Sequence, residues 1–393
     1  MDQISKSEFD KEILKYLGKK QVILKGRGGV GKTVILLQMA YNLWLRERKR
    51  SLVLSYNKAL VADIRRTMCL LDMPRNLDGG IEVKTIHSFL WYLFKSLGYH
   101  HEDDDYLETY EDKKNELVEF LSSETLTKDE LDNIINNHRE EFYYDYIFVD
   151  EAQDWPQNEI NILQSLYDYT QVIVADGEDQ YIRGKQANWV QFGENKLFKP
   201  KKLNKCIRMK KSLTIFVNAL AEKLDLSGWD LIPSDKALGG RVIVYEGDLY
   251  KKTDIISEHI SEAKENKNYP LDLLMCVPPK FSKLQESLAF NQIKYWDGTD
   301  DILRSEPCFD REAIRIVQYD SCRGLEGWTT FNFELDTFWD YKFNLEKNNF
   351  KDFENFQTPE EQAYEMTAKW ILIPLTRSMD TIVINLTEKD SQI

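Results

Sequence analysis

Short apolar runs alternate with stretches of helical periodicity along the first half of this chain. The apolar runs predict buried strands at residues 21–25, 51–56, 81–85, 146–150 and 172–176. Strands that alternate with helices in this way favour a parallel sheet with helices packed on both faces. We therefore predict an α/β fold for this part of the chain.

The second half of the chain repeats this order of elements without repeating the sequence. The predicted elements are, in order, helix 213–224, strands 241–245 and 271–277, helix 281–291, and strands 313–318, 330–333 and 381–385. A basic stretch at 196–205 separates the two series, and residues 91–144 have the pattern of a small, acidic helical insertion. We predict two α/β domains, 1–200 and 201–393, with the insertion in the first.

Composition narrows the class of protein. Hydrophobic residues make up 42% of the 393 residues and charged residues 30%, which is typical of a globular protein. The five cysteines form no C-x-x-C pair, so we expect reduced thiols and neither disulfides nor a zinc site. With no apolar run long enough for a membrane span and no signal-peptide core, we expect a cytoplasmic protein without membrane contact.

The net charge limits where nucleic acid could bind. A formal charge of -14 argues against nucleic-acid binding over the general surface, because phosphate contacts require clustered Lys and Arg. Any nucleic-acid site is therefore expected to be a local groove. The most acidic stretch, residues 102–112, is expected to be a solvated loop or helix face; docking of a basic partner is the alternative.

One glycine-rich motif lies between the first predicted strand and a predicted helix at residues 34–44. The sequence GRGGVGKT at 26–33 matches the phosphate-binding pattern G-x-x-x-x-G-K-[ST]. Glycines let backbone N–H groups and the helix N-terminus point at an anion. The predicted phosphate-binding residues are Gly26, Gly28, Gly29, Val30, Gly31, Lys32 and Thr33. A glycine-rich turn that binds nothing is the alternative, and the strand–loop–helix context disfavours it.

The predicted strand at 146–150 runs directly into two adjacent carboxylates, Asp150 and Glu151. Asp150 and the hydroxyl of Thr33 are predicted to hold Mg²⁺, which prefers oxygen ligands together with phosphate oxygens and water. Glu151 is predicted to accept a proton from the attacking water. A solvated acidic turn is the alternative. We therefore expect an ATP hydrolase with ATP and Mg²⁺ as cofactors.

Further segments make the chain resemble the UvrD/Rep-type superfamily 1 helicases. They are, in chain order, SYNKAL at 55–60, TIHSF at 85–89, DEAQD at 150–154, ADGEDQ at 175–180, LNKCIR at 203–208, YDSCRGLEG at 319–327 and LTRS at 375–378. The resemblance covers nearly the whole chain. It implies two RecA-like P-loop domains that close around ATP, and helicase or translocase activity on single-stranded nucleic acid, DNA more than RNA.

The resemblance also implies roles for residues outside the phosphate loop. Gln180 would sense the γ-phosphate, Glu326 would contact the ribose, and Arg208 and Arg377 would act as arginine fingers from the second domain. Arginines placed against the developing γ-phosphate charge are a large catalytic term. For each arginine taken singly, the alternative is an ordinary helix-end or surface residue.

The segments at 55–60 and 85–89 line the path of the single strand in this family. The strand-contacting residues that the resemblance implies are Tyr56, Asn57, Lys58, Thr85, His87, Ser88 and Tyr181. Tyr56, Tyr181 and Trp189 are candidates for stacking on a base, which tolerates any sequence. The alternative for each of these aromatic residues is a place in the core.

The chain departs from the family pattern in three places. No glutamine stands ahead of the phosphate loop to select adenine, and the large insertions of the family are reduced to short segments. Residues 337–369 form an unusual connection, for which we expect a capping helix, or alternatively an interaction element. The reduced insertions also leave a second function open, an ATPase switch or sensor in a defence or repair complex, with a protein partner and little unwinding.

Overall fold

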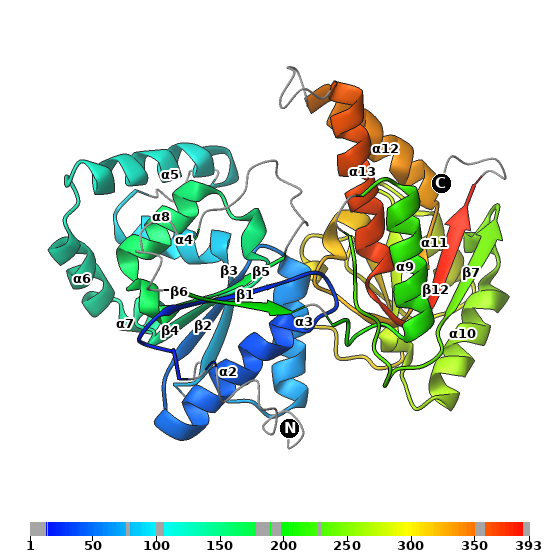
Figure 1. The fold of residues 1–393 in the computed structure, drawn as a ribbon, viewed down its shortest axis with the longest axis horizontal. Helices are drawn as coiled ribbons and strands as arrows, with labels where there is room; N and C mark the ends of the chain where they lie inside the picture. The colour runs from blue at the N-terminus through cyan, green and yellow to red at the C-terminus, as the bar shows by residue number, and fades with distance from the viewer. Residues whose placement is uncertain are drawn as a thin grey trace. The chain divides into compact units, whose positions relative to one another are not determined.

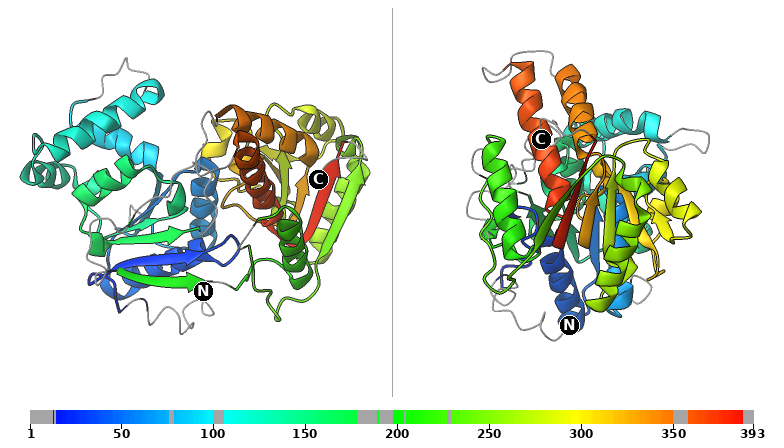
Figure 2. Two further views of the ribbon diagram at one scale, coloured as in Figure 1. Left: turned by 45° about the horizontal axis from the view of Figure 1, so that its top comes forward. Right: turned by 90° about the vertical axis from the view of Figure 1, so that its right-hand side faces the viewer.

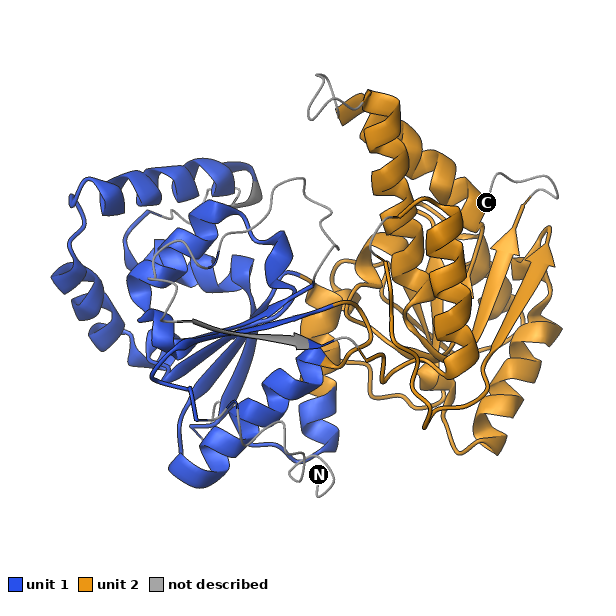
Figure 3. Ribbon diagram, in the orientation of Figure 1, with its two compact units in different colours: residues 1–26, 32–56, 67–203 blue, residues 27–31, 57–66, 204–393 orange. Residues whose placement is uncertain are grey.

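The computed structural model describes residues 13, 15–75, 79–99, 106–177, 189, 198–203, 205–226, 229–349 and 358–387. The chain forms two compact units (Figure 3). Residues 1–26, 32–56 and 67–203 make up the first unit, and residues 27–31, 57–66 and 204–393 make up the second. The second unit therefore includes two short segments from the first half of the chain.

The first unit is built on a six-stranded parallel sheet with the strand order β3-β2-β4-β5-β1-β6. Its strands are β1 (Gln21–Gly26), β2 (Ser51–Ser55), β3 (Ile81–Thr85), β4 (Tyr146–Val149), β5 (Val172–Asp176) and β6 (Phe198–Leu203). Strand β5 lies between β1 and β4, with Ile173 opposite both Val22 and Phe148. Because all strands are parallel, the carboxyl ends of β1, β4 and β5 meet at one edge of the sheet.

Helices cover both faces of this sheet (Figures 1 and 2). They are α2 (Lys32–Glu47), α4 (Ile86–Ser96), α5 (Tyr106–Ser122), α6 (Lys128–Asn137), α7 (Arg139–Phe142) and α8 (Gln157–Leu166). Residues 58–66 of the helix α3 (Lys58–Leu70) belong to the second unit. Alternate residues such as Leu52, Leu54 and Ile147 pack with α4, α5, α6 and α8 in one core, while α2 contacts β3, β4 and β5. This period-two alternation is what a sheet buried on both faces requires.

The predicted insertion is helical, as the sequence analysis expected. Its described part comprises the end of α4, then α5, α6 and α7, and α5 packs against α8. Leu117 and Leu131 of the insertion are buried in the same core as the sheet residues. The insertion is therefore an integral layer of the first unit.

The second unit contains another six-stranded parallel sheet, with the order β7-β12-β11-β8-β10-β9. Its strands are β7 (Arg241–Glu246), β8 (Leu273–Val277), β9 (Tyr295–Asp297), β10 (Ile314–Gln318), β11 (Gly327–Asn332) and β12 (Ser378–Leu386). Its helices are α9 (Lys211–Lys223), α10 (Thr253–Glu265), α11 (Lys283–Phe290), α12 (Leu335–Asn349) and α13 (Pro359–Leu375). The two parallel sheets with flanking helices confirm the predicted α/β fold class.

Helices α10 and α11 pack with one face of the second sheet, where residues such as Met275, Ile316 and Phe331 form the core. Helices α9, α12 and α13 contact strands β7, β11 and β12. Residues 337–369, for which a capping helix was expected, fall largely in α12 and α13, which pack on each other as a hairpin (Figure 1). None of the helices that the structure describes is long and apolar enough to cross a membrane.

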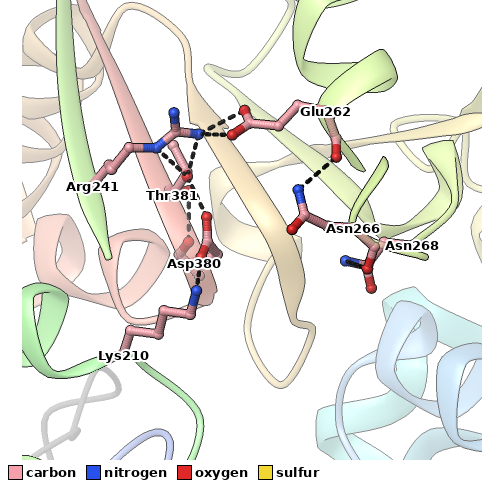
Figure 4. Close-up of polar contacts among 8 residues, drawn as sticks. Lys210, Arg241, Glu262, Asn266, Asn268, Asp380 and Thr381 are labelled. Atoms are coloured by element: carbon pink, nitrogen blue, oxygen red, sulfur yellow. Dashed lines mark hydrogen bonds and ion pairs between the residues drawn. The ribbon is translucent and has the colours of Figure 1, made fainter. Parts of the chain in front are cut away.

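Polar contacts fasten the edge strand β7 to its neighbours (Figure 4). The Arg241 guanidinium donates to both carboxylate oxygens of Glu262 on α10, at 2.5 and 2.6 Å, and to the Thr381 hydroxyl on β12 at 3.2 Å. That hydroxyl donates to Asp380, which also pairs with Lys210. Because Arg241 is half exposed, its ion pair contributes little stability and mainly orients α10.

Three elements escaped the sequence analysis. Strand β6 lies in the basic stretch between the two predicted domains, and the sequence predicts neither β6 nor strand β9 nor helix α10. Strand β6 pairs with β1 along its whole length at an edge of the sheet, where lysines and a proline are tolerated. Its sequence, FKPKKL, therefore carries no apolar alternation that could reveal a strand.

Gly324 tests the packing of the second unit. Its φ is +79°, and a Cβ atom there would lie 2.5 Å from Cδ2 of the buried Leu60. We expect Gly324→Ala to destabilise the protein by about 2 kcal/mol, from backbone strain and overpacking together. Thermal and urea unfolding measure this loss.

Gly247→Ala is the matched control. Gly247 has a φ of +84° in the same unit, and a Cβ there would meet nothing within 4 Å. This variant should show the backbone strain alone, about 1 kcal/mol. Equal losses in the two variants would show that Leu60 moves aside without cost.

Candidate functional site

The phosphate loop connects β1 to α2 at the carboxyl edge of the first sheet. Lys32 is buried, and its Nζ donates to the carbonyl oxygen of Gly26 at 2.7 Å. Gly31 has a φ of +84°, and a Cβ there would lie 2.6 Å from the Ile207 side chain. The positive φ favours glycine at this position, because a residue with a Cβ is strained there.

Thr33 and Asp150, the two predicted Mg²⁺ ligands, are in direct contact at the carboxyl edge of the sheet. The Thr33 hydroxyl donates to Oδ2 of Asp150 at 2.6 Å, and the backbone N–H of Glu151 donates to Oδ1 at 3.0 Å. Asp150 is completely buried at the end of β4. The two oxygen-bearing side chains therefore fit a hard cation in their donor chemistry.

The environment of Asp150 opposes its ionisation. Burial, followed by the negative charge of Glu151, raises the pKa of Asp150 from 3.8 to about 6. The hydroxyl of Thr33 and the positive charge of Lys32 act in the opposite direction. A cation placed beside this carboxylate would stabilise its ionised form and lower its pKa.

Glu151 occupies a left-handed backbone conformation, with φ 50° and ψ 43°, which is uncommon for a residue with a side chain. Its Oε2 accepts a hydrogen bond from Nε2 of Gln153 at 2.7 Å. Oε1 of Gln153 in turn accepts from the backbone N–H of Gly177 at 2.7 Å. Gln153 thus connects the acids after β4 to the segment after β5.

Sequence reasoning did not assign a role to Gln153, although it lies inside the DEAQD motif. Gln153 is buried, and its amide holds the Glu151 side chain in one orientation. The signal that could have found it is its place in the motif between the acidic pair Asp150–Glu151 and Asp154. Its role became visible only with Gly177, which is far away in sequence.

Three predicted residues of the second unit come together. Nε of Arg208 donates to the Glu326 carboxylate at 3.0 Å, and its Nη1 donates to the carbonyl oxygen of Thr376 at 3.4 Å. Arg377 follows directly and is buried, with Nε donating to the carbonyl oxygen of Ile373 at 3.0 Å. The guanidinium groups of Arg208 and Arg377 are therefore both held at the end of α13.

Arg208 also touches the glycine-rich loop within the second unit, which includes residues 27–31. The backbone N–H groups of Ile207 and Arg208 donate to the carbonyl oxygen of Gly29 at 3.1 and 3.2 Å. A Cβ at Gly29 would lie 3.1 Å from Sγ of Cys206. The segment with the first predicted arginine finger thus lies against a predicted phosphate-binding residue.

Among the predicted strand-contacting residues, Tyr56 and His87 lie together. Their rings are 5.2 Å apart in an edge-to-face arrangement, and both side chains are half-buried. Thr85 caps α4 by accepting a hydrogen bond from the Ser88 backbone N–H at 3.1 Å. These four residues of the first unit lie at the junctions that follow β2 and β3.

Lys58 begins α3 and Asn57 directly precedes it, and both belong to the second unit. Oδ1 of Asn57 accepts from the Ala59 backbone N–H at 2.9 Å, and Nδ2 donates to the carbonyl oxygens of Ser321 and Arg323 at 2.9 and 2.8 Å. Lys58 is exposed. The Asn57 amide therefore holds the start of α3 to the YDSCRGLEG loop, a role that sequence reasoning missed.

The remaining predicted residues differ in what can be said of them. Gln180 and Tyr181 lie outside the described residues. Trp189 is buried, donates from Nε1 to the carbonyl oxygen of Ala152 at 2.9 Å and stacks edge-to-face on Trp155. Of the three aromatic candidates for base stacking, Trp189 thus takes the core alternative.

Comparison with known proteins adds a family match for the first unit. Residues 10–185 match the model of a family described as an AAA domain, AAA_19. The match covers less than half of the chain and includes both the phosphate loop and the DEAQD acids. This part of the chain is therefore similar to an AAA-type P-loop domain. No curated protein matches the chain in sequence.

Among solved structures, the chain is similar to the Arterivirus nonstructural protein 10, a helicase, at 12% identity and a TM-score of 0.37. The similarity covers 97% of this chain and 63% of that one. The chain thus spans less than two thirds of the length of this protein. At such a TM-score, the fold assignment rests on the strand order and register described above.

The raised pKa of Asp150 predicts an unusual stability effect. Because its folded pKa of about 6 lies above the ordinary 3.8, ionisation penalises the folded state fully above pH 6 and not below pH 3.8. Asp150→Asn should therefore stabilise the protein by about 1–3 kcal/mol near pH 7.5, without nucleotide or Mg²⁺. The gain should disappear towards about pH 4.

Asparagine can keep both hydrogen bonds of Asp150, since its oxygen can accept from Glu151 N–H and its amide can donate to the Thr33 hydroxyl. Thermal unfolding of both proteins across this pH range measures the effect. Thr33→Val is the control, because it removes the hydroxyl and leaves the carboxylate. Destabilisation by Asp150→Asn at neutral pH would contradict the assigned direction.

Proposed function

We propose that this protein is an ATP-dependent translocase or helicase that acts on single-stranded nucleic acid, DNA more than RNA. The observation that carries the proposal is the 2.6 Å hydrogen bond between Thr33 and Asp150, next to Glu151. It joins the two halves of an ATPase motif that are far apart in sequence. The match of residues 10–185 to an AAA domain supports this assignment.

In this proposal, the phosphate loop and Lys32 bind the triphosphate, while Thr33 and Asp150 hold Mg²⁺. Mg²⁺ held by these residues would supply positive charge that neutralises part of the charge of the triphosphate. The residues Gly26, Gly28, Gly29, Val30 and Gly31 supply backbone N–H groups to the phosphates. Lys32 exchanges its bond to the Gly26 carbonyl for one to a phosphate oxygen.

Glu151 is the proposed general base that accepts a proton from the attacking water. Its left-handed backbone and its hydrogen bond to Gln153 restrict the orientation of the carboxylate. Gln180 is proposed to sense the γ-phosphate. Since Gln153 also binds the Gly177 backbone, a change at Glu151 is transmitted to the segment that carries Gln180.

Arg208 and Arg377 are proposed to stabilise the charge that develops on the γ-phosphate, and Glu326 to contact the ribose. The ion pair between Arg208 and Glu326 supports a shared site for these residues. We propose that Arg208 turns from the Glu326 carboxylate to a phosphate oxygen, which releases the carboxylate for the ribose. Nucleotide binding and rearrangement of this pair are therefore coupled in our proposal.

The single strand is proposed to contact Tyr56, Asn57, Lys58, Thr85, His87, Ser88 and Tyr181. The two rings of Tyr56 and His87 support base stacking, and exposed Lys58 supports a phosphate contact. The role proposed for Asn57 depends on the hydrogen bonds that its amide donates to the carbonyl oxygens of Ser321 and Arg323. Strand binding is thereby connected to the loop that carries Glu326.

An ATPase switch that binds a protein partner is the second candidate. The observation that favours it is the α12–α13 hairpin, which exposes Tyr341, Leu345 and Tyr364. ATP turnover with and without single-stranded DNA and RNA tests the first candidate, together with stepping along a labelled strand. Strong stimulation with directional stepping supports the motor. Turnover that no nucleic acid changes would overturn it and favour the switch.

Glu151→Gln should retain ATP binding and lower turnover about 10²- to 10⁴-fold, because the amide cannot accept the proton from water. Nucleotide affinity and steady-state hydrolysis measure the two effects. Lys32→Ala is the contrasting variant, since it should lose nucleotide affinity first. Near-normal hydrolysis by Glu151→Gln would remove Glu151 as the base.

A further inference from the structure

A buried carboxylate on α8 connects the helical insertion to the proposed strand site. Glu159 is 1% exposed. Its Oε2 accepts a hydrogen bond from the Tyr56 hydroxyl, and its Oε1 accepts from the Tyr110 hydroxyl at 2.8 Å and from Lys114 Nζ at 3.0 Å. All these residues belong to the first unit. One carboxylate thus binds a residue that precedes α3 and two residues of α5.

Lys114 is the cation that balances this carboxylate. Its side chain has no exposed surface, and its Nζ lies 4.5 Å from the centre of the Tyr110 ring and 2.7 Å from Oε1 of Glu111. Removing one partner of a buried ion pair leaves the other charge uncompensated, which is strongly unfavourable. The buried ion pair between Lys114 and Glu159 therefore holds α5 against α8, and neutralising either charge alone would destabilise this contact.

The same cluster orients the aromatic rings. The His87 ring lies 5.2 Å from the Tyr56 ring and 4.8 Å from the Tyr110 ring, measured between centroids. Tyr56 also packs edge-to-face on Trp155 at 5.7 Å. Both tyrosine hydroxyls bind Glu159, so this carboxylate holds two rings that each contact the His87 ring.

We propose that Glu159 and Lys114 are positioning residues for strand binding: they hold Tyr56 and His87 in the orientation that stacks on bases of a single strand. This inference rests on the proposed function and deepens it. It gives the small insertion a role, since α5 supplies Lys114 and Tyr110 to a site formed otherwise by the junctions after β2 and β3. Tyr56 and His87 are half-buried, so neither residue is enclosed in the core.

Neutralising one charge tests the proposal. Lys114→Met should raise about tenfold the concentration of oligothymidylate or oligouridylate, about 20 nucleotides long, that gives half-maximal ATPase stimulation. Turnover without a strand, turnover at saturating strand and the KM for ATP should stay within about twofold, because the phosphate loop is untouched. The double variant Lys114→Met/Glu159→Gln should return the half-maximal concentration towards the wild-type value, since a carboxamide can still bind both hydroxyls.

Two further variants keep the test decisive. Glu119→Gln, at an exposed position of α5, should behave as wild type. Tyr110→Phe retains the ion pair and removes one hydroxyl, so it should raise the half-maximal concentration severalfold even where Lys114→Met does not fold. The melting temperature of each variant is measured alongside.

The outcomes separate the inference from the function on which it rests. A lowered melting temperature with an unchanged half-maximal strand concentration, in both Lys114→Met and Tyr110→Phe, would show a purely structural cluster and overturn the inference alone. A wild-type protein that no strand stimulates would overturn the proposed function, and the inference with it. A selective rise that the double variant reverses supports both.

Discussion

The buried carboxylate of Asp150 constrains the whole region around the phosphate loop. Asp150 is fully buried, so water does not solvate its carboxylate. The negative charge therefore needs hydrogen-bond donors or positive charge close to it. Here the Thr33 hydroxyl, the Glu151 N–H group and the charge of Lys32 only partly meet it, and the pKa remains raised. The ionised carboxylate therefore lowers the stability of the fold as it stands.

In both units, a buried lysine on a helix pairs with an acid on another element. In the first unit, Lys114 of α5 pairs with Glu159. In the second, Lys342 of α12 pairs with Asp320 of the YDSCRGLEG loop at 2.7 Å and lies 3.8 Å from the centre of the Trp370 ring. Because a buried ammonium group needs a specific partner, each ion pair fixes a helix against the element that carries the acid.

Much of the fold could be predicted because its central strands are short and almost entirely apolar. Strands such as β2 and β8 are buried on both faces, so their sequences are runs of mostly apolar residues that predict a strand. Strand β6 could not be predicted in this way, since it lies at an edge and is held by the backbone of β1. The same holds for the site. The phosphate loop is a local motif that the sequence reveals, whereas the role of Gln153 follows from its hydrogen bond to Gly177, which comes after a different strand.

By itself the sequence determined the local chemistry, namely a glycine loop with Lys32 and Thr33, and two acids at the end of an apolar strand. These features depend only on residues that are neighbours along the chain, so a short sequence motif is enough to predict them. Only the tertiary structure decided the raised pKa of Asp150, the pairing of Arg208 with Glu326, and the cluster around Glu159. Each of these depends on burial and on partners distant in sequence, which no local pattern specifies.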